Sequence, residues 1–291
     1  MRLDRSAPIA VLLTAASFTL ANGCAATSDS VSPVAPNATN ATTPATRLAT
    51  TTSTAPAPVP TVTPYWIRDK VIGAGQARPV APEAAANLPR AALDALLSRP
   101  NEIERAEGLS TDLQTNVLVY DFAVFDGVAT VNFSRTFQTF NTRPQVAQVV
   151  FTLTQFKEIK KVQFRVEGLT NGATGVPPMD RTSFEDIMPP ALIDTPTIGG
   201  SPTKGKIRVS GTALLTVPAV SWRLEGADGP PLAQGTIEVK PRTGDEARGR
   251  LQADLDAPAP SLYNGPAWLT IDAGVAGEPP IRIPVTLPPP P

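Results

Sequence analysis

The sequence predicts an α+β domain followed by an all-β sandwich, with a disordered tether in front of both. Asp126-Gly127 separates two apolar runs, and this dipeptide is the strongest short-range signal for a β-hairpin. Apolar residues recur at helical spacing across residues 145–156, which places a helix soon after that hairpin. After residue 192, short strand patterns return about every dozen residues with turn residues between them, as in a β-sandwich.

The first domain is expected over residues 64–168, in the order β-α-β-β-α-β. Its opening strand is Tyr65-Trp66-Ile67-Arg68-Asp69, and Asn87-Leu88-Pro89 then starts a helix that Pro100 ends. The remaining elements are hairpin strands at 117–125 and 128–133, the helix at 145–156 and a strand at 162–166. Both helices are predicted on one side of a small sheet, which makes this domain an α+β layer.

A connector rich in glycine and proline is predicted over residues 169–191, and the sandwich over residues 192–288. The expected strands of the sandwich are 207–211, 220–224, 235–239, 249–255, 267–271 and 281–285. Helical periodicity is absent from this half, so an all-β domain is the prediction.

Several segments of the first domain carry a family resemblance. They are the opening strand, Ala91-Ala92-Leu93-Asp94-Ala95-Leu96-Leu97-Ser98-Arg99-Pro100, Gly108-Leu109-Ser110-Thr111, Asp126-Gly127-Val128-Ala129-Thr130-Val131-Asn132-Phe133-Ser134 and Gln148-Val149-Val150-Phe151-Thr152-Leu153-Thr154-Gln155-Phe156. Together they resemble the GerMN domain of sporulation and spore germination proteins. Some members of that family help to assemble multiprotein complexes during sporulation, so the resemblance implies a scaffolding or assembly role related to sporulation or germination.

The second half carries a weaker resemblance, through Pro196, Ser210-Gly211-Thr212-Ala213, Trp222 and Ile283-Pro284-Val285. It resembles the immunoglobulin-like domain of bacterial spore germination, although the cysteine pair of antibody domains is missing. That domain commonly follows a GerMN domain in actinobacterial lipoproteins, so the order of the two domains agrees with both resemblances.

Residues 1–23 are predicted to be a lipoprotein signal peptide. Arg2 and Arg5 give it a positive start, and an apolar run from Ala7 to Ala21 ends just before Cys24, the single cysteine of the chain. This pattern resembles the bacterial lipobox, so Cys24 is the predicted lipidation site. The alternative is an ordinary cleaved signal peptide, because Ala21 and Asn22 depart from the usual lipobox residues. The apolar run is shorter than the roughly 20 residues that a membrane-spanning helix needs.

Residues 24–63 are predicted to form a disordered tether. Alanine, threonine, serine and proline dominate this segment, and charges are rare. Such a composition buries too little apolar surface to offset the entropy of ordering the chain. The folded domains are therefore expected to stand clear of the membrane.

Composition argues against several classes of function. The chain has no histidine and one cysteine, so the commonest general base and the commonest metal ligand are missing. We predict no cofactor, no metal and no catalytic residue. The net charge of −1 and the lack of a long basic block argue against nucleic acid as a partner.

Lys157, Lys160 and Lys161 form the densest positive cluster and are the candidate interaction patch. The alternative is a polar loop without a binding role. The close carboxylates Glu102-Ile103-Glu104 and Glu185-Asp186 are expected to be solvated loop charges, since neither pair has the spacing of a catalytic or cation site.

The sequence therefore predicts a non-catalytic protein of the cell membrane, anchored by lipid at Cys24 and facing the extracytoplasmic side. Its two domains are expected to bind an unidentified envelope protein or a cell-wall polymer. The alternative is an envelope enzyme or carrier that acts on glycan or lipid through carboxylates.

Overall fold

The computed structural model describes residues 59–138, 142–169, 177–227, 230–259, 262–263 and 265–289. The predicted signal peptide, Cys24 and nearly all of the predicted tether lie outside these residues. Pro56–Pro291 forms one compact unit. Among the described residues, no helix is both long and apolar enough to cross a membrane.

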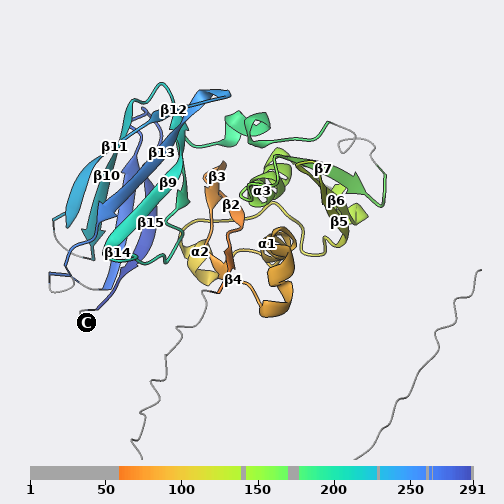
Figure 1. The fold of residues 1–291 in the computed structure, drawn as a ribbon, viewed down its shortest axis with the longest axis horizontal. Coiled ribbons are helices and arrows are strands. Elements are labelled where there is room, and N and C mark those ends of the chain that lie inside the picture. Colours follow the sequence, from red (N-terminus) through yellow and green to blue (C-terminus); the bar gives the residue numbers. More distant parts are fainter. Residues whose placement is uncertain are drawn as a thin grey trace, which may run out of the picture. The chain divides into compact units, whose positions relative to one another are not determined.

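The first half of this unit is a mixed α+β domain (Figure 1). Its strands are β1 (Thr61–Val62), β2 (Tyr65–Arg68), β3 (Val71–Ala74), β4 (Arg78–Pro79), β5 (Val119–Phe125), β6 (Val128–Phe133) and β7 (Lys161–Val166). Its α-helices are α1 (Leu88–Leu97), α2 (Glu102–Ala106) and α3 (Arg143–Leu153), and its 3-10 helices are η1 (Pro82–Asn87), η2 (Arg135–Gln138) and η4 (Arg181–Ile187). The strands and helices predicted for this half are all present, and the α+β class is confirmed.

Local sequence signals explain where these elements begin and turn. The side chain of Asn87 accepts a hydrogen bond from the Arg90 amide at the start of α1. At the start of α3, the side chain of Thr142 accepts a hydrogen bond from the Gln145 amide. Asp126 and Gly127 have φ values of 46° and 74°, the backbone of the hairpin turn that an Asp-Gly pair favours. β5 and β6 therefore pair antiparallel, and β7 joins β6 in parallel.

The opening strand differs from the prediction, because it does not join the main sheet. β2 pairs with β3, a strand that the sequence did not indicate, while β5, β6 and β7 form a separate sheet. Buried polar side chains of α3 bond to the backbone of Tyr65 instead: Thr152 Oγ1 accepts from its amide at 3.0 Å, and Gln148 Nε2 donates to its carbonyl at 3.4 Å. The helix thus satisfies backbone groups that a sheet would otherwise pair.

α3 is the centre of the first core. Every residue from Gln145 to Leu153 is buried, which is unusual for a helix of a small domain and follows from its position against α1, β2 and η4. On the small sheet, the rings of Phe133 and Phe137 stack at 4.1 Å, and Phe164 lies 5.7 Å from Phe137. These contacts bury one face of the β5-β6-β7 sheet.

The second half is all-β, as predicted. Its strands are β8 (Ala191–Thr195), β9 (Lys206–Leu214), β10 (Ala219–Gly226), β11 (Ala233–Glu238), β12 (Lys240–Arg242), β13 (Asp245–Asp256), β14 (Gly265–Asp272) and β15 (Ile281–Leu287). They form two four-stranded sheets, in the orders β11-β10-β14-β15 and β12-β13-β9-β8, which share one hydrophobic core (Figure 1). β8 and β12 are additions to the predicted strands.

β8 contributes side chains to both hydrophobic cores, because neighbouring residues of the strand face opposite sides. Leu192 and Ile193 are both buried, but Leu192 belongs to the core of the α+β domain and Ile193 to the core of the sandwich. Successive side chains of a strand point to opposite faces, so one strand serves both domains. The sequence did not indicate this strand because an apolar run without alternation, next to two prolines, gives no period-2 signal.

Candidate functional site

The predicted lysine patch lies where the loop after α3 meets β7: Lys157 and Lys160 are in the loop, and Lys161 is the first residue of β7. Lys157, Lys160 and Lys161 are all exposed. Lys161 Nζ lies 3.9 Å from Oδ2 of Asp180, which directly precedes η4, and the exposed Glu158 adds an acid within the loop itself. Ion pairs this long and this exposed contribute little to stability. The loop is a solvated polar segment, and its role in binding stays a prediction.

The prediction that Glu102 and Glu104 are solvated loop charges is right for the first residue and wrong for the second. Glu102 is exposed, whereas the side chain of Glu104 is completely buried in α2. Glu104 accepts hydrogen bonds from Trp66 Nε1 at 2.8 Å, the Gln76 amide at 2.8 Å and the Asn101 amide at 2.7 Å. Buried charges are tolerated only when they are paired and hydrogen-bonded. Because several donors bond to the Glu104 carboxylate, its role is structural: it holds neighbouring segments together.

Arg78 completes this buried cluster. Its Nη2 lies 2.7 Å from Glu104 Oε2, and its guanidinium carbon lies 5.5 Å from the centre of the Trp66 ring. The cluster joins α2 to β2 and β4 and carries no catalytic geometry. Among the described residues, no group of three or more acidic or thiol side chains is arranged to hold a metal ion.

Glu185 and Asp186 lie in η4, where each meets an arginine. Arg143 donates to the two carboxylate oxygens of Asp186 at 2.6 and 2.8 Å, and this hydrogen bonding lowers the pKa of Asp186. Glu185 Oε2 lies 3.6 Å from Arg248 Nη1. Both carboxylates are therefore engaged in ion pairs, which the sequence analysis did not anticipate.

Tyr65, Arg181 and Asp194 form the clearest polar contact between the two halves. Tyr65 Oη donates to Asp194 Oδ1 at 2.5 Å, and Arg181 Nη1 lies 3.5 Å from the same oxygen. The Arg181 guanidinium also lies over the rings of Tyr65 and Phe151, at 5.1 and 4.9 Å. Burial, reinforced by Asp194, raises the pKa of the Tyr65 phenol well above its usual range, so the phenol is a neutral donor.

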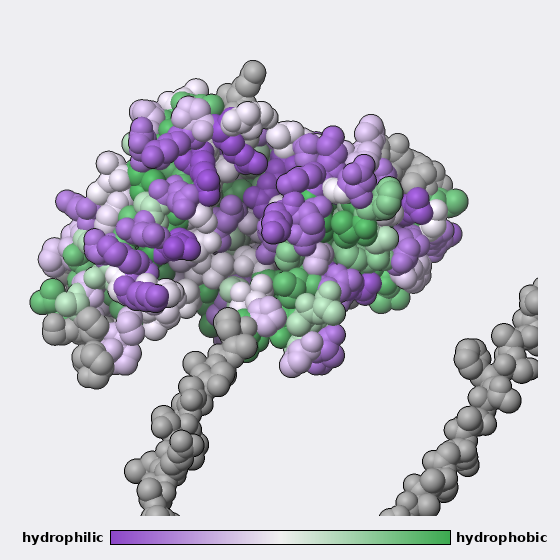
Figure 2. Space-filling view, viewed as in Figure 1, coloured by the Kyte–Doolittle hydropathy of each residue, from purple (hydrophilic) through white to green (hydrophobic). Residues whose placement is uncertain are grey.

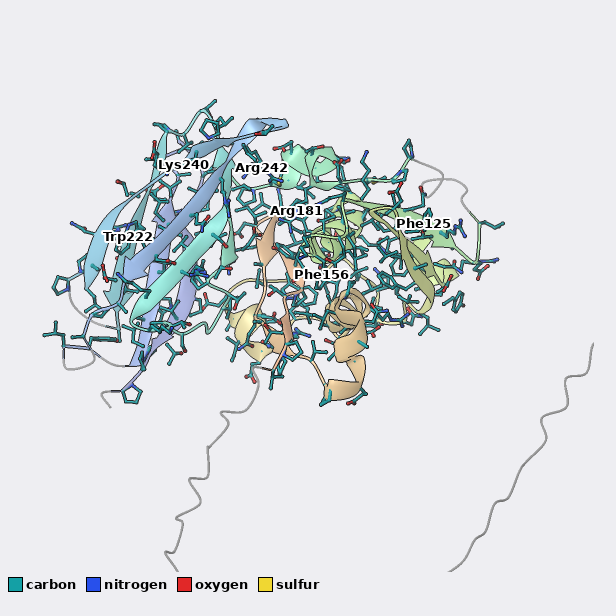
Figure 3. All side chains as sticks on the ribbon, in the orientation of Figure 1. Phe125, Phe156, Arg181, Trp222, Lys240 and Arg242 are labelled. Carbon is teal, nitrogen blue, oxygen red and sulfur yellow. The ribbon has the colours of Figure 1, made fainter. Side chains whose placement is uncertain are left out.

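A surface that the sequence analysis missed lies on β5. This strand is at the edge of the β5-β6-β7 sheet, and among the described residues only β6 pairs with it. Four large apolar side chains on and next to it are exposed: Leu118 by 58%, Tyr120 by 57%, Val124 by 40% and Phe125 by 85%. Figure 3 labels Phe125 at the hairpin end of this strand.

The geometry of β5 explains this exposure. Val124 stands opposite the buried Ala129 of β6, so its side chain is on the face of the sheet that packs against the core. At the edge strand, however, the core residues do not cover it, and it is exposed. A register shift between Val119 and Asp121 bends the strand beside Tyr120. A signal was available in the sequence, because the run Val117 to Phe125 is more apolar than a half-exposed strand needs.

These features can be compared with known proteins. Residues 63–172 match the Germane family model, which is described as sporulation and spore germination. This chain contains a Germane domain. The GerMN resemblance predicted from the sequence is thereby confirmed, and the buried helix α3, the β5 edge and the Glu104 cluster all belong to the Germane domain.

The chain was also compared with solved structures. The chain is similar to the tandem GerMN domains of the sporulation protein GerM from Bacillus subtilis, with 16% identity and a TM-score of 0.34, over 68% of this chain and 62% of that one. It is also similar to the first GerMN domain of that protein, with 24% identity and a TM-score of 0.30, over 42% of this chain and 94% of that one. No curated protein matches the chain. The presence of the Germane domain therefore rests on the family model.

Proposed function

We propose that this protein is a non-catalytic, lipid-anchored protein of the cell envelope that holds a partner protein through the open edge of β5. The observation that carries this proposal is the combination, on one strand, of an unpaired sheet edge with exposed Leu118, Tyr120, Val124 and Phe125. Exposed apolar clusters mark interaction sites, and an open edge offers backbone groups to an added strand.

The occupant of this edge is an extended segment of another envelope protein. Strand addition uses main-chain hydrogen bonds for affinity and side-chain contacts for specificity. The apolar residues of β5, together with exposed Asp121 on the strand and exposed Asp126 in the turn after it, favour a segment that carries apolar and basic side chains. A second copy of β5 is disfavoured because it would bring these acidic residues together.

The membrane anchor of the proposal is Cys24, which becomes the acylated first residue of the mature protein. Two or three acyl chains, at about 0.8 kcal/mol per buried methylene, hold a protein firmly where one chain binds only marginally. We expect the wild type to fractionate with membranes and Cys24→Ala to be released. If Cys24→Ala stays with membranes and mass analysis finds no acyl group on the wild type, the anchor is wrong.

The family description suggests that the bound partner belongs to sporulation or germination machinery. Within that setting, the Germane domain serves as the docking module, and the sandwich is joined to it by the contact of Tyr65, Arg181 and Asp194. The loop of Lys157, Lys160 and Lys161 is a second candidate surface, suited to an acidic partner or wall polymer.

The docking proposal is tested by crosslinking and pull-down from membranes. Tyr120→Ser and Phe125→Ser should each reduce the recovery of the crosslinked partner, because they remove exposed apolar contacts without opening the core. Leu262→Ser is the matched control, since Leu262 is 79% exposed but belongs to the sandwich. Equal recovery from all four proteins would count against the β5 edge.

A further inference from the structure

The outward surface of the β12-β13-β9-β8 sheet is polar and rich in cations. Side chains alternate along these strands, so Arg250 points outward while Leu251 enters the sandwich core, and Arg208 points outward beside the buried Val209. We call the outward surface that carries Arg208, Ser210, Thr212, Lys240, Arg250 and Gln252 the cationic face. Figure 2 shows hydrophilic residues gathered over these strands.

Two cations of this face, Lys240 and Arg250, are not neutralised by an acidic side chain among the described residues. Arg208 lies 3.1 Å from Asp254 and Lys206 is paired with Asp256. Within the described part of the chain, by contrast, Lys240 and Arg250 form no ion pair. They stand directly opposite each other on β12 and β13. Like charges in such a cross-strand pair are destabilising, so Lys240 and Arg250 repel each other at this position in the folded protein.

The cationic face is hollowed, and its hollows adjoin one another. A hollow of about 640 Å³ lies beside Arg181, Arg242 and Arg250. A second, of about 370 Å³, lies beside Lys240, Arg250 and Gln252, and a third, of about 570 Å³, lies beside Lys204, Arg208 and Asp254. The first two share Arg250, and the last two share Asp254. A series of linked hollows suits a chain molecule better than a single small ion.

The lining offers two kinds of hydrogen-bonding group. Guanidinium groups bind phosphate or carboxylate groups through paired N–H donors. Ser210 and Thr212 add hydroxyls next to Arg250 in the first hollow, and Gln252 adds an amide in the second, and these groups match sugar hydroxyls. Figure 3 labels Lys240 and Arg242 on β12 and Arg181 on the side of the Germane domain.

We propose that the cationic face binds an anionic polysaccharide, with Lys240 and Arg250 at the centre of the site. The proposal rests on the cell-envelope location given under the proposed function, because such polymers occur there, but it uses a different surface from the β5 edge. A membrane surface fits less well, because none of the exposed large apolar side chains among the described residues lies on this face. The anion is a phosphate or a carboxylate, and the test distinguishes them.

The test measures binding by the full chain carrying Cys24→Ala, which lacks the thiol for acylation. Three polymers are titrated: a phosphodiester-bearing teichoic acid, carboxylate-bearing polygalacturonate and neutral dextran. We expect binding to at least one anionic polymer, none to dextran, and weaker binding as salt is raised. The anionic polymer that binds more tightly identifies the anion.

The variant Lys240→Ser/Arg250→Ser should weaken that binding by about tenfold or more, because charged hydrogen bonds are lost. Its fold should be intact by circular dichroism, since the substitution relieves a repulsion. Lys70→Ser/Arg165→Ser is the matched control: it removes the same charge from two exposed positions that belong to no proposed binding surface, and it should leave binding unchanged.

Three results would overturn the proposal: no binding to either anionic polymer, equal weakening in both double variants, or tighter binding to phosphatidylglycerol vesicles that depends on Lys240 and Arg250. Failure of this proposal does not bear on the β5 edge, because neither test substitutes a residue of the other's proposed binding surface.

Discussion

Replacing Glu104 with alanine tests whether the buried cluster around it holds the Germane domain together. The side chain is completely buried, and its removal leaves the Trp66 indole, the amides of Gln76 and Asn101 and the Arg78 guanidinium without their shared acceptor. The burial of Glu104 cannot be predicted from neighbouring residues in the sequence, because the donors that bond to it come from β2, β4 and the segment before α2.

The magnitude follows from the contacts. Each neutral donor left without its acceptor costs about 1 kcal/mol or more, so the Trp66 indole and the amides of Gln76 and Asn101 together give a cost of about 3 kcal/mol. A second estimate comes from the ion pair between Glu104 and Arg78: removing one partner of a buried ion pair costs about 3–5 kcal/mol. We therefore expect Glu104→Ala to lower the free energy of unfolding by about 3–5 kcal/mol.

The assay is urea unfolding followed by circular dichroism, with Glu102→Ala as the matched control. Glu102 is an exposed glutamate of the same helix, so its loss should cost less than about 1 kcal/mol through the helix dipole. A Glu104→Ala change below about 1 kcal/mol, or one equal to that of the control, would refute the reasoning.

Two further predictions concern the junction and its neighbours. Gly211→Ala should destabilise the protein by about 1–3 kcal/mol in urea, because the added methyl group would lie 2.1 Å from the backbone oxygen of Leu192, and a wild-type midpoint would contradict this. The neutral phenol of Tyr65 is favoured by folding, so its stabilisation is present below its ordinary pKa of about 10 and is lost as pH rises above it. Tyr65→Phe should remove that alkaline loss, and identical profiles for both proteins above pH 10 would argue against it.

Much of the fold could be predicted because local signals and tertiary structure agree. Asp126-Gly127 makes the turn it predicts, and the helix expected at residues 145–156 is α3 at Arg143–Leu153. The strands of the sandwich follow their alternation. Agreement of this kind is expected where local preference and the global fold coincide.

The differences arise where long-range contacts decide the outcome. β2 leaves the main sheet because Thr152 and Gln148, distant in sequence, take its backbone groups. Glu104 is buried because Arg78 and Trp66 surround it. Neither partner set has a fixed spacing in the sequence, so periodicity could not reveal them.

The candidate surfaces were less predictable than the fold. The lysine cluster was identified because charge density can be read directly from sequence, whereas the β5 edge required knowledge of strand order. The cationic face depends on β12, a three-residue strand that pairs Lys240 with Arg250. Short strands of this kind have no recognisable period.

The central claim is that the β5 edge holds an envelope protein. It is tested most directly by a photocrosslinking residue in the membrane-anchored protein, as Tyr120→benzoylphenylalanine on β5 and Leu262→benzoylphenylalanine on the sandwich. We predict a discrete crosslinked protein product from position 120 that Phe125→Ser diminishes, and no such product from position 262. Identical products from both positions, or none from position 120, would contradict the account.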